Sequence, residues 1–314
     1  MRSLLFPRPV MIGLDIQTNG IRLIGLKKNK HQFHIECIAT TDFDAQTIFV
    51  ESKIKYWDTL VTILAKLVDQ LKIRDRPVAI HLPVHFVKMG YLQLPLGLSD
   101  EQIKTEIYAQ AKHDWQNKED LSLDFSQQTL THAACSEILF VTANREYLSQ
   151  YIQCVCSAGL RVQVVDVDIY ALIRVLQYTD GLLFEQNVQR EWLQKDAHAI
   201  IYITQTIVTL VLFTWQTIIS YQYWPINETE EDWLQLSDKI LTCLQSFSDK
   251  EIKRLIICGH SRYISRLIES VTQVYRLPVC FPEIFAHIKP PVPIDSAADF
   301  LVACGLAMRN HYKW

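Results

Sequence analysis

Residues 11–26 read MIGLDIQTNGIRLIGL, and this stretch decides the fold. Apolar runs occupy Met11 to Ile16 and Ile21 to Leu26, and the polar residues Gln17 to Gly20 separate them. Two apolar runs divided by a short polar stretch that ends in glycine are typical of strands joined by a tight turn. The stretch therefore predicts a strand hairpin, and we call its turn, Gln17–Gly20, the first knuckle.

The same pattern occurs in the second half of the chain. Ile200 to Ile203 and Ile207 to Phe213 are apolar, and Thr204–Thr206 forms a second knuckle between them. A further strand pattern follows each hairpin, at Phe33 to Thr40 and at Thr217 to Tyr223. Because both halves have the same order of elements, the sequence predicts a duplicated fold.

Each half also supplies an amphipathic helix. Apolar residues recur three or four positions apart, a spacing that fits a helix with one buried face. These residues are Trp57, Leu60, Val61, Leu64, Leu67, Val68 and Leu71 in the first half, and Trp233, Leu236, Ile240, Cys243, Leu244 and Phe247 in the second.

The region between the hairpins predicts an additional subdomain. A strand from Val78 to Leu82 runs into Pro83, and Ser99 with Gln102 forms a capping box that begins a helix. Strands are expected near 121–125, 137–142 and 161–166, and helices near 146–156 and 169–176. We expect a first lobe at 1–179 with a subdomain inserted at about 83–159, a linker at 180–195 and a second lobe at 196–314.

The composition is that of a folded protein without a marked charge. The 314 residues are 49% hydrophobic and 21% charged, which is enough for two cores. The formal net charge is -3 and the two signs are interspersed along the chain. We therefore expect no binding of nucleic acid or of an anionic membrane, and we interpret Lys27, Lys28 and Lys30 as a solvated hairpin tip.

The longest apolar run, Ala199 to Trp215, contains Thr204, Gln205, Thr206 and Thr209. It is also shorter than the roughly 20 apolar residues of a spanning helix. The sequence predicts no transmembrane segment of its own, so a partner would supply any membrane connection.

The two knuckles differ in their chemistry. Duplicated hairpins resemble the actin, Hsp70 and sugar kinase superfamily, in which knuckle groups hold phosphates and strand-end acids organise the metal. Asp15, Thr18 and Asn19 match these roles, although an ordinary polar turn explains them equally well. Tyr202 and Thr204 stand where the second acid and a turn glycine are expected, which predicts a lost carboxylate and a narrower phosphate space.

A third element contacts the adenosine in that superfamily. Leu255 to Cys258, then Gly259-His260-Ser261, then a helix through Ile264 form a strand-turn-helix pattern. One glycine remains of the usual two or three, and His260 adds bulk where backbone must approach a ligand.

The same tripeptide is also half of a hydrolase nucleophile elbow. Asp295 or Asp299 and then His311 follow it in the order of a catalytic triad. Tyr263 replaces the second glycine of the elbow, and little chain remains downstream, so we disfavour this alternative.

Two residue pairs that could form a metal site or a catalytic site have simpler structural explanations. His81 and His85 are separated by about 13 Å in an extended chain, which is too far for one zinc ion. Asp166 and Asp168 could form paired carboxylates for acid/base work, but they follow a strand and open a helix, which favours helix capping. We predict no metal site and no catalytic residue.

The order of several short motifs resembles the PilM family, a relative of the cell-division protein FtsA. The matching stretches are Gly13–Ile16, Leu94–Ser99, Leu123–Phe125, Gly159–Leu160, Val164–Val167, Gly259, Leu277–Val279 and Cys304–Ala307. Their order over nearly the whole chain is more specific than any one of them. The resemblance implies a bilobed α/β fold of the actin type, with an α+β subdomain inserted in the first lobe.

The resemblance also implies a pocket for ATP and Mg. Its residues would be Asp15, Thr18, Asn19, Arg22, Gly259 and Ser261. The departures from the family pattern at Gln17, Tyr202, Thr204 and His260 predict a degenerate pocket, and hence a pseudo-ATPase scaffold rather than an enzyme.

The partner implied by the resemblance is the N-terminal tail of PilN, and through it PilO and the inner-membrane platform. The protein would be cytoplasmic and peripheral to the membrane. An extended peptide in a groove beside the inserted subdomain would be held by main-chain hydrogen bonds and side-chain pockets. The predicted groove residues are Leu82, Val84, Phe86, Ile103 and Ile107, each of which could equally be a core residue.

Three other functions remain open from the sequence. The first is an ATP-binding switch whose nucleotide state controls PilN binding. The second is a filament-forming relative of FtsA, and the third is the equivalent component of type II secretion or DNA uptake.

Overall fold

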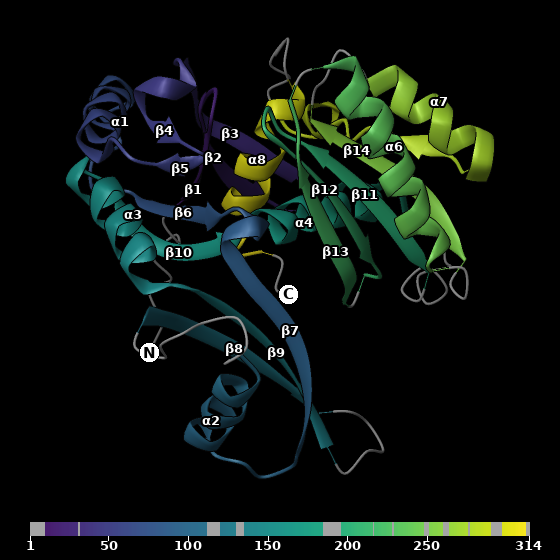
Figure 1. Cartoon of the computed structure of the whole chain (residues 1–314). Helices are drawn as coiled ribbons and strands as arrows, with labels where there is room; N and C mark the ends of the chain where they lie inside the picture. The colour runs from purple at the N-terminus through teal and green to yellow at the C-terminus, as the bar shows by residue number, and fades with distance from the viewer. Residues whose placement is uncertain are drawn as a thin grey trace.

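The first hairpin lies at the centre of a five-stranded sheet (Figure 1). The computed structural model describes residues 10–30, 32–111, 120–129, 135–184, 196–215, 217–227, 229–247, 251–259, 264–275, 277–289 and 297–311. The strands of this first sheet are β1 (Met11–Gln17), β2 (Gly20–Asn29), β3 (Gln32–Asp42), β6 (Pro77–Leu82) and β10 (Arg161–Val167). Their order is β10-β6-β1-β2-β3, with the hairpin strands antiparallel and β6 and β10 parallel to β1. The predicted hairpin is confirmed.

The second hairpin is the centre of a matching sheet. Its strands are β11 (Ala197–Ile203), β12 (Ile207–Phe213), β13 (Ile218–Pro225), β14 (Ile252–Gly259) and β15 (Val279–Cys280). The order β13-β12-β11-β14-β15 repeats that of the first sheet, with β11 in the place of β1. The strand directions repeat as well, so the predicted duplication is confirmed.

Helices cover these sheets in layers. On the first sheet, α1 (Trp57–Leu71) and α3 (Arg145–Ser157) lie side by side on one face, with α4 (Asp168–Phe184) and α8 (Leu301–Ala307) together on the other. The outer face of the second sheet packs against α6 (Glu230–Gln245) and α7 (Ile264–Tyr275). The main core runs without a break from the first sheet to Ile200 and Tyr202 on the inner face of the second. The main core therefore extends across both lobes, and the outer face of the second sheet forms a separate core with its helices.

Helix α8 connects the end of the chain to the first lobe. The sequence assigned residues 196–314 to the second lobe, yet α8 packs against β1, β2 and β6. Gly13 permits this contact, because a Cβ there would overlap the backbone carbonyl of Ala303. A close approach of helix to strand at one glycine has no periodic signal, so the sequence did not indicate it.

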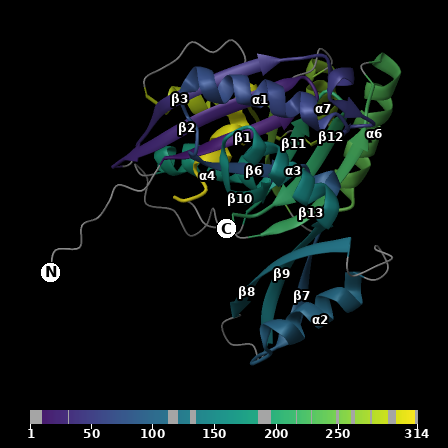
Figure 2. The same cartoon turned by 90° about the vertical axis from the view of Figure 1, so that its left-hand side faces the viewer.

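The inserted subdomain, which we call the insert, is a three-stranded sheet with one helix and projects beyond the two lobes (Figure 2). The sheet consists of β7 (Val87–Pro95), β9 (Cys135–Asn144) and β8 (Leu121–Thr129), in that order, and α2 (Asp100–Ala111) packs on one face. The capping box is confirmed, since the Ser99 N–H donates to Gln102 Oε1 (2.8 Å) and the Gln102 N–H to Ser99 Oγ (3.3 Å). The sequence placed α3 inside the insert, but its buried residues Tyr151 and Val155 belong to the main core.

Short elements complete the description. A small hairpin of β4 (Phe49–Val50) and β5 (Lys53–Ile54) follows β3. The short 3-10 helices are η1 (Ala45–Thr47), η2 (Val84–Phe86), η4 (Ile284–Ala286) and η5 (Ala297–Phe300). In the part of the chain that the structure describes, we found no helix with the length and apolar character needed to cross a bilayer.

Candidate functional site

The first knuckle places Asp15 in a fully buried position between the lobes. Its carboxylate accepts a hydrogen bond from Gln17 Nε2 (2.7 Å) and lies 2.8 Å from Nε2 of His81, which comes from β6. Burial alone would lower the pKa of His81, but the hydrogen bond to Asp15 and the charges of Asp15 and Asp168 outweigh it and raise the pKa. The carboxylate of Asp15, the acid of the first knuckle, is thus already bonded to two neighbouring side chains.

The two knuckles touch each other across the cleft between the lobes. Thr18 Oγ1 donates a hydrogen bond to Gln205 Oε1 of the second knuckle (3.3 Å). Ser52, in the turn of the β4–β5 hairpin, donates to Thr206 Oγ1 (3.3 Å). Asn19 uses its backbone carbonyl to accept the N–H of Phe43 (3.3 Å). The Thr18 hydroxyl and the Asn19 backbone carbonyl therefore bond to the protein itself, whereas the buried Oδ1 of Asn19 has no hydrogen-bond partner among the described residues.

The other predicted nucleotide residues are held in a similar way. Arg22 is buried and forms ion pairs with Asp42 (2.8 Å) and Asp299 (3.3 Å). Gly259 has a φ of 99°, and a Cβ there would overlap the carbonyl of Ile203, so only glycine fits at the end of β14. Ser261 lies outside the described residues, as does His260.

The cavity left between the knuckles, which we call the cleft, has a volume of about 60 Å³. Tyr202 fills its second-lobe side, and burial followed by the charge of Asp15 raises the pKa of this phenol well above its ordinary value. Small-molecule sites in proteins usually enclose about 300–1,000 Å³. The part of the cleft that the structure describes is thus several times smaller than such sites.

Asp168 stands at the boundary of the cleft, at the start of α4. Its Oδ1 accepts the backbone N–H groups of Val84 (3.0 Å) and Ile169 (2.8 Å). Burial raises the pKa of Asp168 to about 6, against the opposing charge of His81 and those two hydrogen bonds. The carboxyl group therefore holds the end of β6 next to the start of α4.

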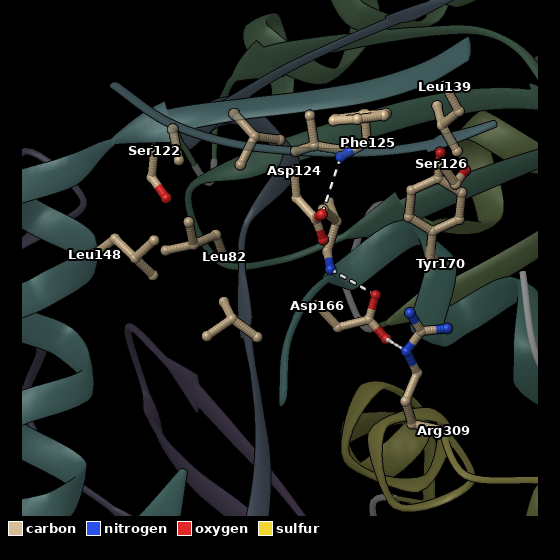
Figure 3. A pocket seen from close by; sticks show the side chains of 15 residues that line it. Leu82, Ser122, Asp124, Phe125, Ser126, Leu139, Leu148, Asp166, Tyr170 and Arg309 are labelled. Atoms are coloured by element: carbon tan, nitrogen blue, oxygen red, sulfur yellow. Dashed lines mark hydrogen bonds and ion pairs between the residues drawn. The ribbon is translucent and has the colours of Figure 1, made fainter. Parts of the chain in front are cut away.

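A larger cavity of about 370 Å³ lies between the insert and the first lobe (Figure 3). We call it the groove. Its apolar wall comes from the ends of β6 and β10, the open face of the insert sheet, and α3. The apolar residues are Leu82, Val87, Phe125, Leu139, Val141, Ala143, Leu148, Val165 and Val167.

Polar residues gather at one part of the groove. Asp166 Oδ2 pairs with the fully buried Arg174 (2.8 Å) and with Arg309 Nε (3.5 Å), just beyond α8. Asp124 points from β8 into the space near this pair, and its Oδ1 accepts the N–H of Phe125 (2.9 Å) (Figure 3). Asp166 was expected to cap α4, but its carboxylate is taken up by the two arginines and by the N–H of Val167 (2.9 Å). Both carboxylates thus lie beside the apolar wall of the groove.

In the part of the chain that the structure describes, the groove runs along an edge of the first sheet that pairs with no further strand. β10 is the outer strand of the first sheet, and Val165, Asp166 and Val167 of this strand line the groove. An outer strand presents backbone N–H and C=O groups that an extended chain can pair with.

The structure distributes the five predicted groove residues among four places. Leu82 lines the groove, Val84 is buried in the main core, and Phe86 lines the cleft instead. Ile103 and Ile107 have no exposed surface, because they fill the core between α2 and the insert sheet. An apolar helix stripe does not reveal which sheet face it covers, which is why these two residues were placed in the groove.

Sequence reasoning missed most of the groove. Asp124 and its neighbours Ser122 and Ser126 alternate along β8, and this period of two was the available signal that they share one face. Tyr170 and Arg309 gave no such sequence signal that they line the groove. Tyr170 lies in a helix, and Arg309 follows a helix at the other end of the chain.

Comparison with known proteins agrees with this fold. The family described as type IV pilus assembly protein PilM matches residues 13–219. A solved chain of the "PilM-PilN type IV pilus biogenesis complex" has a TM-score of 0.81 at 16% identity, covering 98% of this chain and 100% of its own. A Bacteroides thetaiotaomicron protein described as having an actin-like ATPase fold and unknown function has a TM-score of 0.54 at 11% identity, covering 97% and 99%.

The cytoplasmic domain of EpsL, an inner-membrane component of the type II secretion system of Vibrio cholerae, is a further structural relative. Its TM-score is 0.51 at 12% identity, covering 97% of this chain and 96% of its own. At these identities the likeness is one of fold, and it confirms the predicted actin-like architecture.

Proposed function

Because this chain belongs to the PilM family of type IV pilus assembly proteins, we propose that it is a scaffold whose groove binds the N-terminal tail of a PilN-type inner-membrane protein. The observation that carries the proposal is the groove of about 370 Å³ between the insert and the outer strand β10. Through PilN, the protein would join PilO and the inner-membrane platform from the cytoplasmic side.

The shape and lining of the groove support an extended peptide. Main-chain groups of such a peptide can bond to the free edge of β10, while its side chains enter the apolar wall around Val141 and Val165. The groove also places Asp124, Asp166 and Arg309 beside the peptide path, where they can fix its register through polar contacts. A structural relative of 16% identity is itself described as a complex with PilN.

The second part of the proposal concerns the cleft. We infer that the cleft has lost the role of a nucleotide site and serves as a joint between the lobes. A volume of about 60 Å³, the contacts of Asp15 with Gln17 and His81, and the bond between Thr18 and Gln205 support this inference. The scaffold would then act without ATP.

Calorimetry with a synthetic peptide tests the groove. The peptide covers the N-terminal tail of the PilN protein from the same organism, and we expect a dissociation constant on the order of micromolar, as for a short peptide in a shallow site. Val141→Trp fills the groove and should weaken binding at least tenfold. Val274→Trp, at a position on α7 that is 52% exposed and far from the groove, is the matched control and should bind as the native protein does.

Two results would contradict the proposal. One is native protein that gives no heat with the peptide at millimolar concentration. The other is equal affinity for Val141→Trp and Val274→Trp, which would place the peptide elsewhere. The same titrations with Mg-ATP test the cleft, and saturable nucleotide binding would refute its loss.

A further inference from the structure

Basic side chains gather along the rim of the first sheet that lies opposite the groove. We define the basic rim by Lys27, Lys30, Lys72, Arg74, Arg76 and Arg161. The strand register places them together, because Arg161 pairs with Pro77 and Met11 pairs with Leu26, so β6 and β10 begin where the β2–β3 hairpin ends. Figure 2 shows this hairpin projecting past the rest of the first sheet.

Backbone contacts hold the loops of the rim together. The Asp75 N–H donates to the Gly159 carbonyl (2.8 Å), and the Arg161 N–H donates to the Arg76 carbonyl (3.0 Å). Lys289 joins the rim beside β3, since its N–H donates to Phe33 O (3.0 Å). These contacts tie the loops of the rim to the first sheet.

The ion pairs of the rim leave an excess of positive charge. Glu36 pairs with Arg76 (3.1 Å) and is 3.9 Å from Lys27, while Asp69 pairs with Arg74 (2.8 Å). Among the described residues, Lys30, Lys72 and Arg161 are exposed and form no salt bridge.

The balance of charge on the rim is opposite to that of the whole chain. With Lys28 and Lys289, the rim carries eight cations against the carboxylates Glu36, Asp69 and Asp75, a net charge of +5. The chain as a whole carries -3, so the rest of the molecule carries -8. The described residues of the rim therefore concentrate positive charge, which the interspersed signs along the sequence did not indicate.

We propose that the basic rim is a docking surface for an anionic lipid bilayer. Five neighbouring strands about 4.8 Å apart give a rim roughly 20 Å wide, and clusters of four to eight Lys and Arg are what anionic leaflets attract. The choice of lipid over nucleic acid rests on the proposed function, which places the protein beside the inner membrane.

The orientation that follows suits the groove. Leu82 and Val167, at the other ends of β6 and β10, line the groove, and six extended residues separate those ends by about 20 Å. A protein held by its basic rim would carry the groove roughly that distance from the lipid surface. An extended tail of a membrane protein can cover this distance with about six residues.

Vesicle sedimentation without any PilN peptide tests the proposal. We expect the native protein to bind vesicles containing phosphatidylglycerol at 50 mM salt, to bind much less at 500 mM salt, and to leave neutral phosphatidylcholine vesicles in the supernatant. The triple variant Lys30→Glu, Lys72→Glu, Arg161→Glu should lower the partition coefficient at least about 100-fold, at roughly fivefold per basic residue removed. The matched control Lys53→Glu, Lys55→Glu, Lys239→Glu makes the same change in net charge at exposed positions off the rim and should bind like the native protein.

Each contrary outcome overturns the lipid assignment. These outcomes are no sedimentation of the native protein, equal binding to neutral vesicles, or an equal loss in both triple variants. Displacement from vesicles by duplex DNA at equal charge would make the rim a nucleic-acid surface instead. The PilN peptide is titrated against the same rim variant, where unchanged affinity is expected, so the failure of the groove and the failure of the rim give different results.

Discussion

The cleft and the groove share the ends of two strands but differ sixfold in volume, at about 60 and about 370 Å³. His81 and Asp168 face the cleft, whereas their neighbours Leu82 and Asp166 face the groove. The side chains that fill the cleft are large and come from both lobes, among them Phe86 and Tyr202. The duplicated pair of hairpins thus closes on itself. Space for a ligand arises instead where the inserted subdomain covers the outer strand of the first sheet.

The groove stays open because α2 covers the face of the insert sheet that points away from it. Among the described residues the insert has one α-helix, α2, and this helix covers one face of its sheet. The other face presents small or branched residues such as Val141 and Ala143 toward β10. Side chains of this size leave a gap between two rigid sheets, whereas tyrosines fill one.

The largest loss of stability is expected from a substitution that removes a contact supporting both the cleft and the groove. Helix α8 packs on Gly13 behind the cleft, and Arg309 beyond its end reaches the groove. Gly13→Val would drive a side chain into the backbone of Ala303 and should cost about 5 kcal/mol of unfolding free energy. Urea denaturation measures this change.

The control for Gly13→Val is Gly97→Ala. Gly97 has a φ of 87° but open space around its Cβ position, so alanine there costs only backbone strain, about 1 kcal/mol. Equal losses in the two variants would show that α8 does not depend on the contact at Gly13.

The next largest effect concerns the groove alone. Arg174 is fully buried, and its ion pair with Asp166 (2.8 Å) lies under the groove floor. Arg174→Met leaves the buried carboxylate of Asp166 with the N–H of Val167 and a 3.5 Å ion pair to Arg309, and should cost about 4 kcal/mol. Thermal unfolding and peptide titration should both show the loss.

Two further variants separate the buried pair from ordinary charge effects. Arg74→Met breaks the exposed pair with Asp69 and should cost only about 0.3 kcal/mol. Adding Asp166→Leu to Arg174→Met removes the unpaired charge and should restore most of the stability. A double variant as unstable as Arg174→Met would mean that the lost packing of the arginine, and not its charge, matters.

The sequence predicts a region well when local contacts form it, and poorly when its contacts join distant parts of the chain. Asp15, Thr18 and Asn19 could be placed on a knuckle because strand and turn patterns act over a few residues. The groove combines Asp124, Asp166 and Arg309 from three distant parts of the chain, and no local pattern encodes their meeting. Likewise, the substitution of Tyr202 for an acid was visible in the sequence, whereas its effect on cavity volume required the packing of both lobes.

An intermediate effect tests the boundary between cleft and groove. Burial raises the pKa of Asp168 from its ordinary value of 3.8 to about 6, so the folded state binds a proton that the unfolded state releases. Stability should therefore fall as the pH rises from about 4 to about 6, by about 3 kcal/mol for a shift of two units. Asp168→Asn keeps the acceptor for Val84 and Ile169 and should remove this dependence.

Denaturant midpoints at pH 4, 5, 6 and 7 measure the effect. The raised pKa of His81 acts in the same direction at higher pH, since its contribution is lost as the pH rises above 6.5 through the folded value. The comparison of native protein and variant is therefore made below pH 6. Parallel pH profiles would show that the buried carboxyl group does not titrate in this range.

The smallest expected effect decides what holds the cleft closed. The hydrogen bond from Thr18 to Gln205 is 3.3 Å long and exposed, so Thr18→Val should cost only about 0.5 kcal/mol. The lobes would stay together because the main core continues through Ile200 and Tyr202, and this apolar contact does not depend on the knuckles. Calorimetry with Mg-ATP should give no binding for either protein. A loss of unfolding free energy above about 2 kcal/mol would contradict this and show that the hydrogen bond between the knuckles keeps the lobes together. Nucleotide binding gained by the variant would show that this bond closes the lobes over a nucleotide-sized space. In that case the cleft would differ from the groove only in being closed.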